Sequence, residues 1–359
     1  MTAEQYVYDL NLGDRDLDNL VNQALNNAAK YIKSCQSFHG AIVWFAGGKL
    51  DPWDHVEAIM GLTISQDFST AQAGFIWLQE NQNSDGSWFA KYFADEDDGD
   101  KDRLKIETNF VAYVATGLWH YYLISQDITF VKKMFSCVER AMQYILSQQT
   151  PEGDIQWAQS SIEILPKDAL VTACASILRS MECAVYLAET CGKNTAQWEE
   201  AYERLAYTLK SCPWRFDRTW ESKDRFSMDW FYPILSGIYS TQESKIRLEK
   251  DWHKFVNETY GCRCVSDEPW VTIAESCELA ISLVASNQRD KAEALFLKLL
   301  RWQDTDGGFW TGYSFRDKAI WPLEKTSWTA AAVILAADAI YGISPASKLF
   351  TSGSGLLQR

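Results

Sequence analysis

Acidic side chains occur at the start of six apolar helical segments in this chain, and tryptophans stand beside four of them. Examples are Pro52-Trp53-Asp54-His55-Val56-Glu57, Met228-Asp229-Trp230 and Trp270-Val271-Thr272-Ile273-Ala274-Glu275. Asp and Glu at a helix N-terminus ordinarily cap free N–H groups and complement the helix dipole. Glu57 and Glu275 lie beyond the cap positions, and capping does not explain the tryptophans. The pattern therefore favours a pocket for a sugar, another polyhydroxylated compound or a cation.

Two reactions suit such a pocket. In glycoside hydrolysis one carboxyl group protonates the leaving oxygen, while a second carboxylate activates water or attacks directly. Like charges and aromatic rings around a carboxyl group raise its pKa, as a general acid requires. In terpene cyclisation a protonated carboxyl group starts a carbocation cascade, and Asp95-Glu96-Asp97-Asp98 matches the Asp-x-Asp-Asp pattern of such initiators. Because this match lies in a highly charged run, we expect it to be a solvated loop.

We interpret Glu57, Asp229 and Glu275 as the candidate acid and base. Arg263 would hold a carboxylate or phosphate, and its pairing with Asp267 is the equally simple structural alternative. No usual zinc-ligand spacing is visible around Cys262-Arg263-Cys264, and the chain has four histidines, so we expect no metal and no cofactor. The substrate-binding candidates are acids that would position the substrate, tryptophans that would stack on it, and their polar neighbours: Trp53, Asp54, Glu107, Asn109, Trp230, Tyr232, Arg263, Asp267, Trp270, Thr272, Trp310 and Trp328.

The elements that would position these residues are twelve long helices in six pairs, because apolar residues recur three and four apart along most of the chain. The second helix of each pair is apolar on all sides, and a helix without a polar face is buried. Six buried helices inside six amphipathic ones predict an all-α (α/α)6 toroid with the acidic openings at one mouth. The expected first helices are 17–35, 68–82, 128–149, 195–211, 242–257 and 289–303. The expected second helices are 53–65, 107–124, 168–191, 227–240, 270–286 and 325–341.

A repeated phrase supports the paired helices. A glutamine at a helix end, a glycine-containing turn and a tryptophan occur four times, beginning at Gln36, Gln82, Gln149 and Gln303. Internal repeats of this length indicate stacked helical hairpins. No linker divides the chain, so we expect one toroid domain over 16–345, with an N-terminal extension over 1–15 and a C-terminal tail over 346–359.

Composition restricts the class of function. The chain has 359 residues, of which 47% are hydrophobic and 23% charged, sufficient for a large core. A net charge of −14 argues against nucleic acid or an anionic membrane as partner. No signal peptide and no run of 18 apolar residues is visible, and the nine cysteines lie mostly in apolar helical stretches. We therefore expect a cytoplasmic protein with reduced thiols and no stable membrane insertion.

The repeats resemble those of squalene cyclases and protein prenyltransferase β-subunits, within the six-hairpin toroid superfamily. The stretch Thr116-Gly117-Leu118-Trp119-His120-Tyr121-Tyr122, followed by Asp127-Ile128-Thr129-Phe130-Val131, instead resembles glucoamylase-type six-hairpin glycosidases. From about residue 41 to 350 the chain is similar to bacterial proteins labelled "prenyltransferase", through openings such as Met228-Asp229-Trp230-Phe231-Tyr232-Pro233. The zinc triad of prenyl transfer and an Asp-x-Asp-Asp motif at an inner helix are both missing.

These observations leave three hypotheses. The first, which we favour, is a carbohydrate-active enzyme of the six-hairpin glycosidase type that hydrolyses or processes a small glycan or glycoconjugate with paired carboxylates. The second is a prenyltransferase- or terpene cyclase-like enzyme acting on an isoprenoid diphosphate, with Arg263 as its support. The third is a non-catalytic toroid that binds a sugar or a protein partner.

Overall fold

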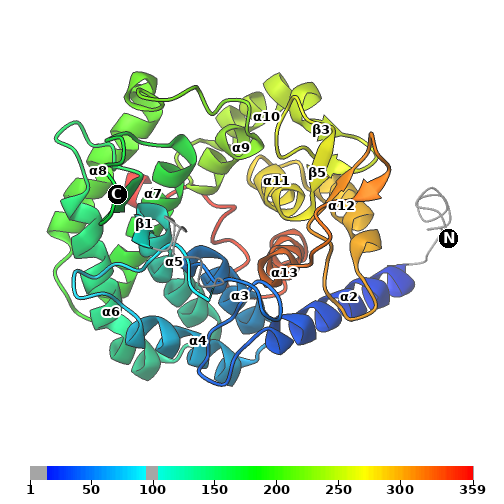
Figure 1. Ribbon diagram of the computed structural model, residues 1–359, viewed down its shortest axis with the longest axis horizontal. Helices are drawn as coiled ribbons and strands as arrows, with labels where there is room; N and C mark the ends of the chain where they lie inside the picture. Colours follow the sequence, from blue (N-terminus) through cyan, green and yellow to red (C-terminus); the bar gives the residue numbers. More distant parts are fainter. Residues whose placement is uncertain (1–13, 94–103, 359) are drawn as a thin grey trace.

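The computed structural model describes residues 14–93 and 104–358, so the Asp95–Asp98 match lies outside the described residues. In the described part, twelve α-helices form two concentric rings (Figure 1). The all-α toroid is confirmed, and each expected helix pair is present. The outer helices are α2 (Asp14–Ser34), α4 (Phe68–Glu80), α6 (Ile128–Ser147), α8 (Ala196–Ser211), α10 (Thr241–Phe255) and α12 (Arg289–Leu299). The inner helices are α3 (Pro52–Ile64), α5 (Thr108–Ser125), α7 (Val171–Thr190), α9 (Ser227–Leu235), α11 (Ile273–Ala285) and α13 (Ser327–Tyr341).

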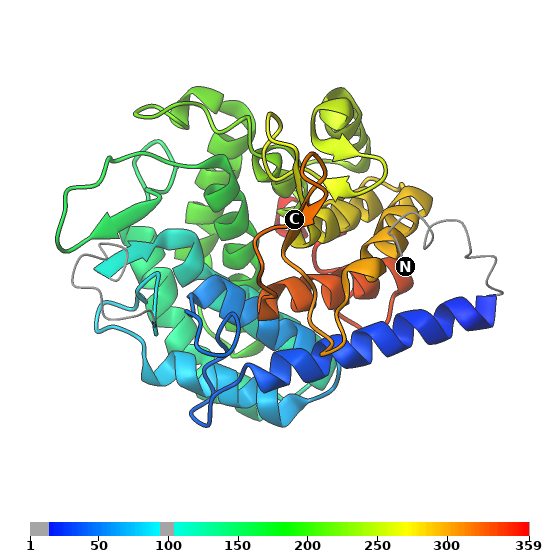
Figure 2. The same cartoon turned by 45° about the vertical axis from the view of Figure 1, so that its right-hand side comes forward.

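The inner ring is closed, because each inner helix packs on the next and α13 packs back on α3. Inner helices bury nearly all of their side chains, whereas outer helix α10 buries only Ser244, Leu248 and Phe255. Helix α2 packs against α13, and Figure 2 shows its first turns extending beyond the ring. Helix α9 ends at Leu235 rather than near 240, because Pro233 interrupts its last turn and Gly237 has a φ of +76°.

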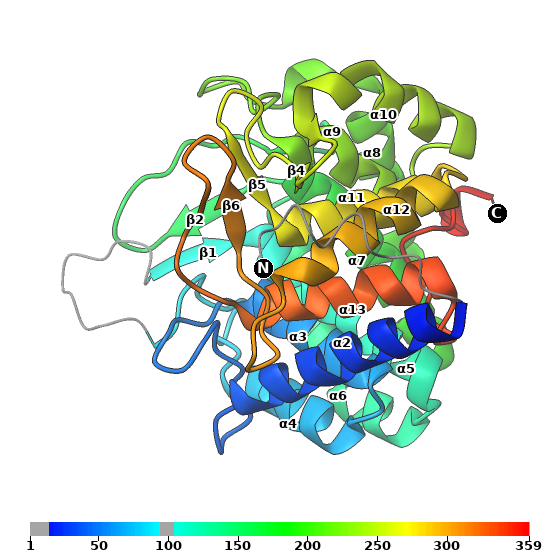
Figure 3. The same ribbon diagram turned by 90° about the vertical axis from the view of Figure 1, so that its right-hand side faces the viewer.

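Short strands lie on the side of the rings where the inner helices begin (Figure 3). Two antiparallel pairs and one three-stranded sheet are formed by β1 (Lys105–Glu107) with β2 (Ala158–Ser160), β3 (Val256–Asn257) with β4 (Gly261–Cys262), and β5 (Trp270–Thr272), β6 (Gly312–Ser314) and β7 (Ala319–Ile320). Among the described residues, 3₁₀ turns cover Pro213–Arg215, Leu300–Trp302 and Leu356–Gln358. Strands β1 and β5 run directly into α5 and α11, so strand pairing fixes where these inner helices start.

The repeated glutamine joins four of the six hairpins to their neighbours. In every copy its Nε2 donates to the carbonyl of the turn glycine and to a backbone carbonyl of the following outer helix. Gln82 bonds Gly86 and Cys137 in this way, both at 2.9 Å. Gln303 bonds Ala24 of α2 at 2.8 Å, which ties the last hairpin to the first. The repeat therefore acts as a structural link around the ring.

We expect Gly86→Ala to destabilise the fold by more than about 3 kcal/mol. Gly86 has a φ of +93°, and an added Cβ would lie 2.3 Å from the Arg140 carbonyl oxygen. Gly192→Ala is the matched control, because Gly192 also has a positive φ, +68°, but no atom lies within 4 Å of the added Cβ. Gly192→Ala should lower the free energy of unfolding by about 1 kcal/mol. Urea unfolding compares the two, and equal losses would contradict a tightly fitted turn at Gly86.

The C-terminal segment closes the end of the toroid opposite the strands (Figure 3). On α7, Arg179 and Glu182 form a buried ion pair, with Nη1 and Oε2 2.5 Å apart. Arg179 also donates to the Ser352 carbonyl oxygen, and the Ser354 hydroxyl donates to Glu182. Among the described residues, α7 is the one helix long and apolar enough to cross a membrane, yet it is a mostly buried helix of the inner ring. All nine cysteines are free thiols, and the cytoplasmic location remains a prediction.

Candidate active site

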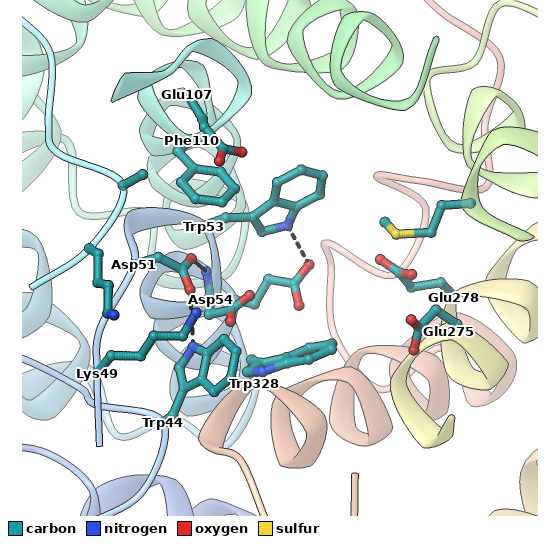
Figure 4. A pocket seen from close by; sticks show the side chains of 14 residues that line it. Trp44, Lys49, Asp51, Trp53, Asp54, Glu107, Phe110, Glu275, Glu278 and Trp328 are labelled. Carbon is teal, nitrogen blue, oxygen red and sulfur yellow. Dashed lines mark hydrogen bonds between the residues drawn. The ribbon is translucent and has the colours of Figure 1, made fainter. Parts of the chain in front are cut away.

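A cavity of about 340 Å³ opens where the inner helices begin (Figure 4). Five inner helices, α3, α5, α9, α11 and α13, or the residues directly before them, contribute to its wall. The lining residues are Trp44, Lys49, Asp51, Trp53, Asp54, Glu57, Ala90, Lys91, Glu107, Phe110, Met228, Glu275, Glu278 and Trp328. Six of these fourteen side chains are carboxylates, which is a high density for a partly enclosed cavity.

Two groups of acids face each other across this cavity. Asp51, Asp54 and Glu57 form the α3 acid group, and Glu275 and Glu278 form the α11 acid group. Figure 4 shows Asp51 and Asp54 on one side of the cavity and Glu275 and Glu278 on the other. The members of each group are three residues apart, a spacing that places helical side chains on one face. The toroid brings the two groups together although more than 200 residues separate them along the chain.

The α3 acid group combines one fixed cap with two carboxyl groups of raised pKa. Asp51 caps α3 by accepting from the Asp54 backbone N–H at 2.9 Å. Glu57 Oε1 accepts from Trp53 Nε1 at 2.9 Å and from the Tyr113 hydroxyl at 3.3 Å. Burial raises the pKa of Glu57 to about 7 in spite of these donors. Burial, followed by the Asp51 and Glu57 carboxylates, raises the pKa of Asp54 well above its ordinary value.

The α11 acid group presents an oxygen atom with no partner. Glu275 Oε2 is buried and accepts no hydrogen bond from the described residues. Trp328 Nε1, also on the cavity wall, is likewise buried without an acceptor in that part of the chain. Burial and then the charges of Glu57 and Glu275 raise the pKa of Glu278 well above its ordinary value. Because unpaired buried polar atoms are costly, Glu275 and Trp328 are suited to bind a ligand or water.

The acid groups make stability depend on pH, and Glu57→Gln tests this dependence. The folded-state pKa of Glu57 is raised from 4.5 to about 7, so its stabilising contribution is present below 4.5 and is lost as pH rises through 7. Glutamine retains an acceptor for Trp53 and Tyr113 but carries no charge. We compare the free energy of unfolding of Glu57→Gln with that of the wild type at each pH. This difference should shift in favour of the variant by about 1–3 kcal/mol between pH 4.5 and pH 8. Denaturant unfolding at both pH values measures this difference, and a pH-independent effect would contradict it.

Aromatic rings surround the α3 acid group. The Trp53 ring lies 5.2 Å from Tyr113, 5.6 Å from Tyr232 and 5.9 Å from Phe110, measured between ring centroids. Trp44 and Trp328 also line the cavity, and their ring centroids are 6.3 Å apart. These rings exclude water from the carboxyl groups and offer apolar surface to a sugar.

The structure brings six of the predicted site residues to the cavity and leaves three more beside it. The six are Trp53, Asp54, Glu57, Glu107, Glu275 and Trp328. Tyr232 packs on the Trp53 ring without lining the cavity. Asn109 and Thr272 are buried at the starts of α5 and α11, and each has a side-chain oxygen without a partner among the described residues. Glu107 is paired with Lys105 at 2.9 Å, which opposes the rise of its pKa caused by burial.

The structure does not bring Asp229 and Trp230 into this cavity. Both line a separate cavity of about 560 Å³ between α9 and α10. The Thr172 hydroxyl donates to Asp229 at 2.6 Å, and burial raises the pKa of Asp229 to about 6. Trp230 stacks on Phe255 at 5.0 Å and donates to the Arg247 carbonyl oxygen, so it is a packing residue. Met228, one position earlier, is the residue of α9 that lines the central cavity.

The remaining predicted residues lie outside the central cavity as well. Arg263 donates to the Ser266 carbonyl oxygen at 2.9 Å, whereas Asp267 is exposed and pairs with Arg225. The alternative in which Arg263 pairs with Asp267 is therefore wrong. Trp270 donates to the Trp321 carbonyl oxygen and lines a different cavity.

The Trp310 ring lies beneath the Lys325 ammonium at 4.8 Å and lines none of the cavities described above. Sequence reasoning missed Glu278 as a site residue, although its spacing of three from Glu275 on a helix was the available signal. No group of three or more His, Cys, Asp or Glu within 14–93 and 104–358 is arranged to hold a metal ion.

A two-ring helical toroid with opposed carboxylates in its central cavity defines the class of six-hairpin glycosidases. Solved structures with this fold include a glycosidase in complex with glucose, with a TM-score of 0.71 at 12% identity over 93% of this chain and 100% of that chain. A D-mannose isomerase has a TM-score of 0.69 at 12% identity, covering 93% of this chain and 99% of that one. A GH63 mannosylglycerate hydrolase from Thermus thermophilus has a TM-score of 0.64 at 14% identity, covering 87% and 99%. At these identities the likeness concerns the fold alone.

A relative of known activity is closer in sequence. The chain is 39% identical over 331 residues, 92% of its length and 90% of the relative's, to an MMP endo-(1,4)-3-O-methyl-alpha-D-mannosidase of Mycolicibacterium hassiacum. The chain belongs to the family of this mannosidase, and it is a carbohydrate-active enzyme of the six-hairpin glycosidase type. The resemblance to prenyltransferases and terpene cyclases is thereby corrected: it reflects the shared toroid rather than shared chemistry. No established family profile matches the chain.

Proposed function

We propose that this chain hydrolyses (1,4) bonds within glycans of 3-O-methyl-α-D-mannose, the specificity given in the name of its relative. The observation that supports this most directly is the pair of acid groups on opposite walls of the central cavity (Figure 4). Hydrolysis of a glycosidic bond requires a proton donor and a base or nucleophile on either side of the reacting carbon. The two inner helices α3 and α11 supply one group each.

Asp54 is the proposed general acid. Burial and the neighbouring carboxylates raise its pKa well above the ordinary value, which favours the protonated carboxyl group that a general acid needs. Its side chain is partly exposed on the cavity wall, whereas the neighbouring Glu57 is only 5% exposed. Glu57 also receives two hydrogen bonds, which stabilise its charged form and fix its position. Asp54 therefore has both the proton and the access that protonation of a leaving oxygen demands.

Glu275 is the proposed base. Its side chain lines the cavity, where its carboxylate can accept a proton from a water molecule, and its buried Oε2 accepts no hydrogen bond from the described residues. Glu278 lies one helical turn deeper on the same face of α11, and its raised pKa favours the neutral, protonated form beside Glu275. A charged Glu275 carboxylate would also stabilise the positive charge that develops on the sugar ring in the transition state.

The direct test is an assay of the purified protein with α-(1,4)-linked oligosaccharides of 3-O-methylmannose and with their unmethylated counterparts. Mass spectrometry of the products distinguishes internal cleavage, which yields fragments of several lengths, from release of single terminal units. The proposal expects internal cleavage and faster hydrolysis of the methylated series. Failure to cleave either series, or release of terminal units alone, would overturn it.

A further inference from the structure

A second cavity with aromatic walls opens beside the strands that lead into α11. It has a volume of about 500 Å³ and lies among β5, β6 and β7. Trp270 and Trp321 form its aromatic wall, with ring centroids 4.9 Å apart and planes inclined by 76°. Glu268, Arg316 and Asp317 give it a polar rim. We refer to it as the rim cleft.

We infer that the rim cleft binds units of the same glycan that lie beyond the bond being hydrolysed. This inference rests on the proposed function, because it assumes a glycan chain in the central cavity. An enzyme that cuts inside a chain leaves sugar units on both sides of the reacting bond, and they must lie along the protein surface. The central cavity, at about 340 Å³, is near the lower limit of small-molecule sites, so an extended chain projects out of it.

The rim cleft is connected to the central cavity by two continuous stretches of chain. Strand β5 carries Trp270 and runs directly into α11, whose first two turns carry Glu275 and Glu278. On the other wall, Trp321 is followed seven residues later by Trp328, which lines the central cavity. Both cavities therefore share their supporting segments, and Figure 3 shows β5 and β6 on the side of the rings where the inner helices begin.

The chemistry of the rim cleft fits a methylated sugar. Trp321 is 57% exposed, and of the sixteen tryptophans only Trp214 is more exposed. The Trp270 N–H donates to the Trp321 carbonyl oxygen at 2.8 Å, so the orientation of the Trp270 ring is fixed before any ligand arrives. Fixed aromatic faces bind the apolar face of a sugar, and an O-methyl group enlarges that apolar surface. The charged rim supplies partners for the remaining hydroxyl groups.

The deciding experiment measures binding in the absence of turnover. In a Glu275→Gln background, calorimetry gives affinities for a long 3-O-methylmannose oligosaccharide and for a disaccharide of the same units. Trp321→Ala removes the ring but keeps the backbone carbonyl that holds Trp270. We expect Trp321→Ala to lower the affinity for the long chain at least about tenfold more than the affinity for the disaccharide. Trp214→Ala is the matched control: Trp214 is 69% exposed and lines neither cavity, so both affinities should stay unchanged.

The possible outcomes separate this inference from the proposed function. If Trp321→Ala lowers the affinity for long and short ligands equally, or lowers neither, the rim cleft is not a glycan site. Cleavage by the wild type would still support the proposed function in that case. A change of oligomeric state in Trp321→Ala, measured by light scattering, would assign the cleft to a contact between copies of the chain and would also overturn the inference. If the wild-type protein neither binds nor cleaves these glycans, the proposed function fails and the inference fails with it.

Discussion

Replacing Glu275 by glutamine is expected to lower kcat about 10²- to 10⁴-fold without loss of folding. Glutamine has nearly the shape of glutamate but cannot accept a proton from water, which is the role proposed for Glu275. The fold should tolerate the change, because the charge of Glu275 raises the pKa of both Glu57 and Glu278 and thus opposes their ionisation. Removing that charge relieves repulsion inside the cavity. Binding of substrate should survive, because the cavity walls are unchanged.

The measurement combines steady-state kinetics, thermal unfolding and calorimetric binding of the uncleaved substrate. Glu324→Gln provides the matched control, since Glu324 lies three residues before α13 at the same mouth but does not line the cavity. It should retain wild-type turnover. Wild-type rates in Glu275→Gln, or equal losses in both variants, would remove Glu275 from the proposed mechanism.

The fold could be predicted from the sequence because its signals are local and repeated. The spacing of apolar residues distinguishes buried helices such as α13 from one-sided helices such as α10. The glutamine and glycine of each repeat could be recognised as a pattern in the sequence, but only the structure shows which groups they bind. The partner of Gln303 is the Ala24 carbonyl oxygen, 279 residues earlier in the chain, and no local pattern identifies such a contact.

The site could be predicted only in part, because the direction of a side chain depends on the rotation of its helix. Neighbouring residues on a helix point about 100° apart. At the start of α9 this places Met228 in the central cavity and Asp229 in another one, although the sequence shows both at the same opening. At the start of α3 and α11 a spacing of three places Asp54 with Glu57 and Glu275 with Glu278, a signal that was present in the sequence although Glu278 was not recognised from it.

Residues in the strands and turns at the mouth were harder to assign. Arg263 and Asp267 are four residues apart and of opposite charge, which suggested an ion pair. The chain between them turns so that Asp267 meets Arg225 instead, at 2.9 Å. Trp270 lies in β5, and its place in the rim cleft depends on pairing with β6, about 40 residues later. Long-range strand pairing of this kind has no local signature in the sequence.

Replacing Asp54 by asparagine is expected to lower kcat for glycans about 10²- to 10⁴-fold, while aryl mannosides with activated leaving groups lose much less. A general acid protonates the departing oxygen, and a leaving group that departs readily as an anion does not need this proton. The pH profile should change as well. In the wild type, activity falls as pH rises through the raised pKa of Asp54, because the deprotonated carboxyl group no longer donates. The variant should lose this alkaline limb.

The variant Glu57→Gln, measured in the same experiment, distinguishes the role of Glu57 from that of Asp54. Glu57 is held by Trp53 and Tyr113, and we assign it the role of positioning rather than of proton donor. Glu57→Gln should therefore keep the leaving-group dependence and the alkaline limb of the wild type, whatever its absolute rate. If instead Glu57→Gln loses both signatures and Asp54→Asn retains them, the proton donor is Glu57. In that case Glu57, although held by Trp53 and Tyr113, would be the group that reaches the substrate. The greater exposure of Asp54 would then not identify the general acid.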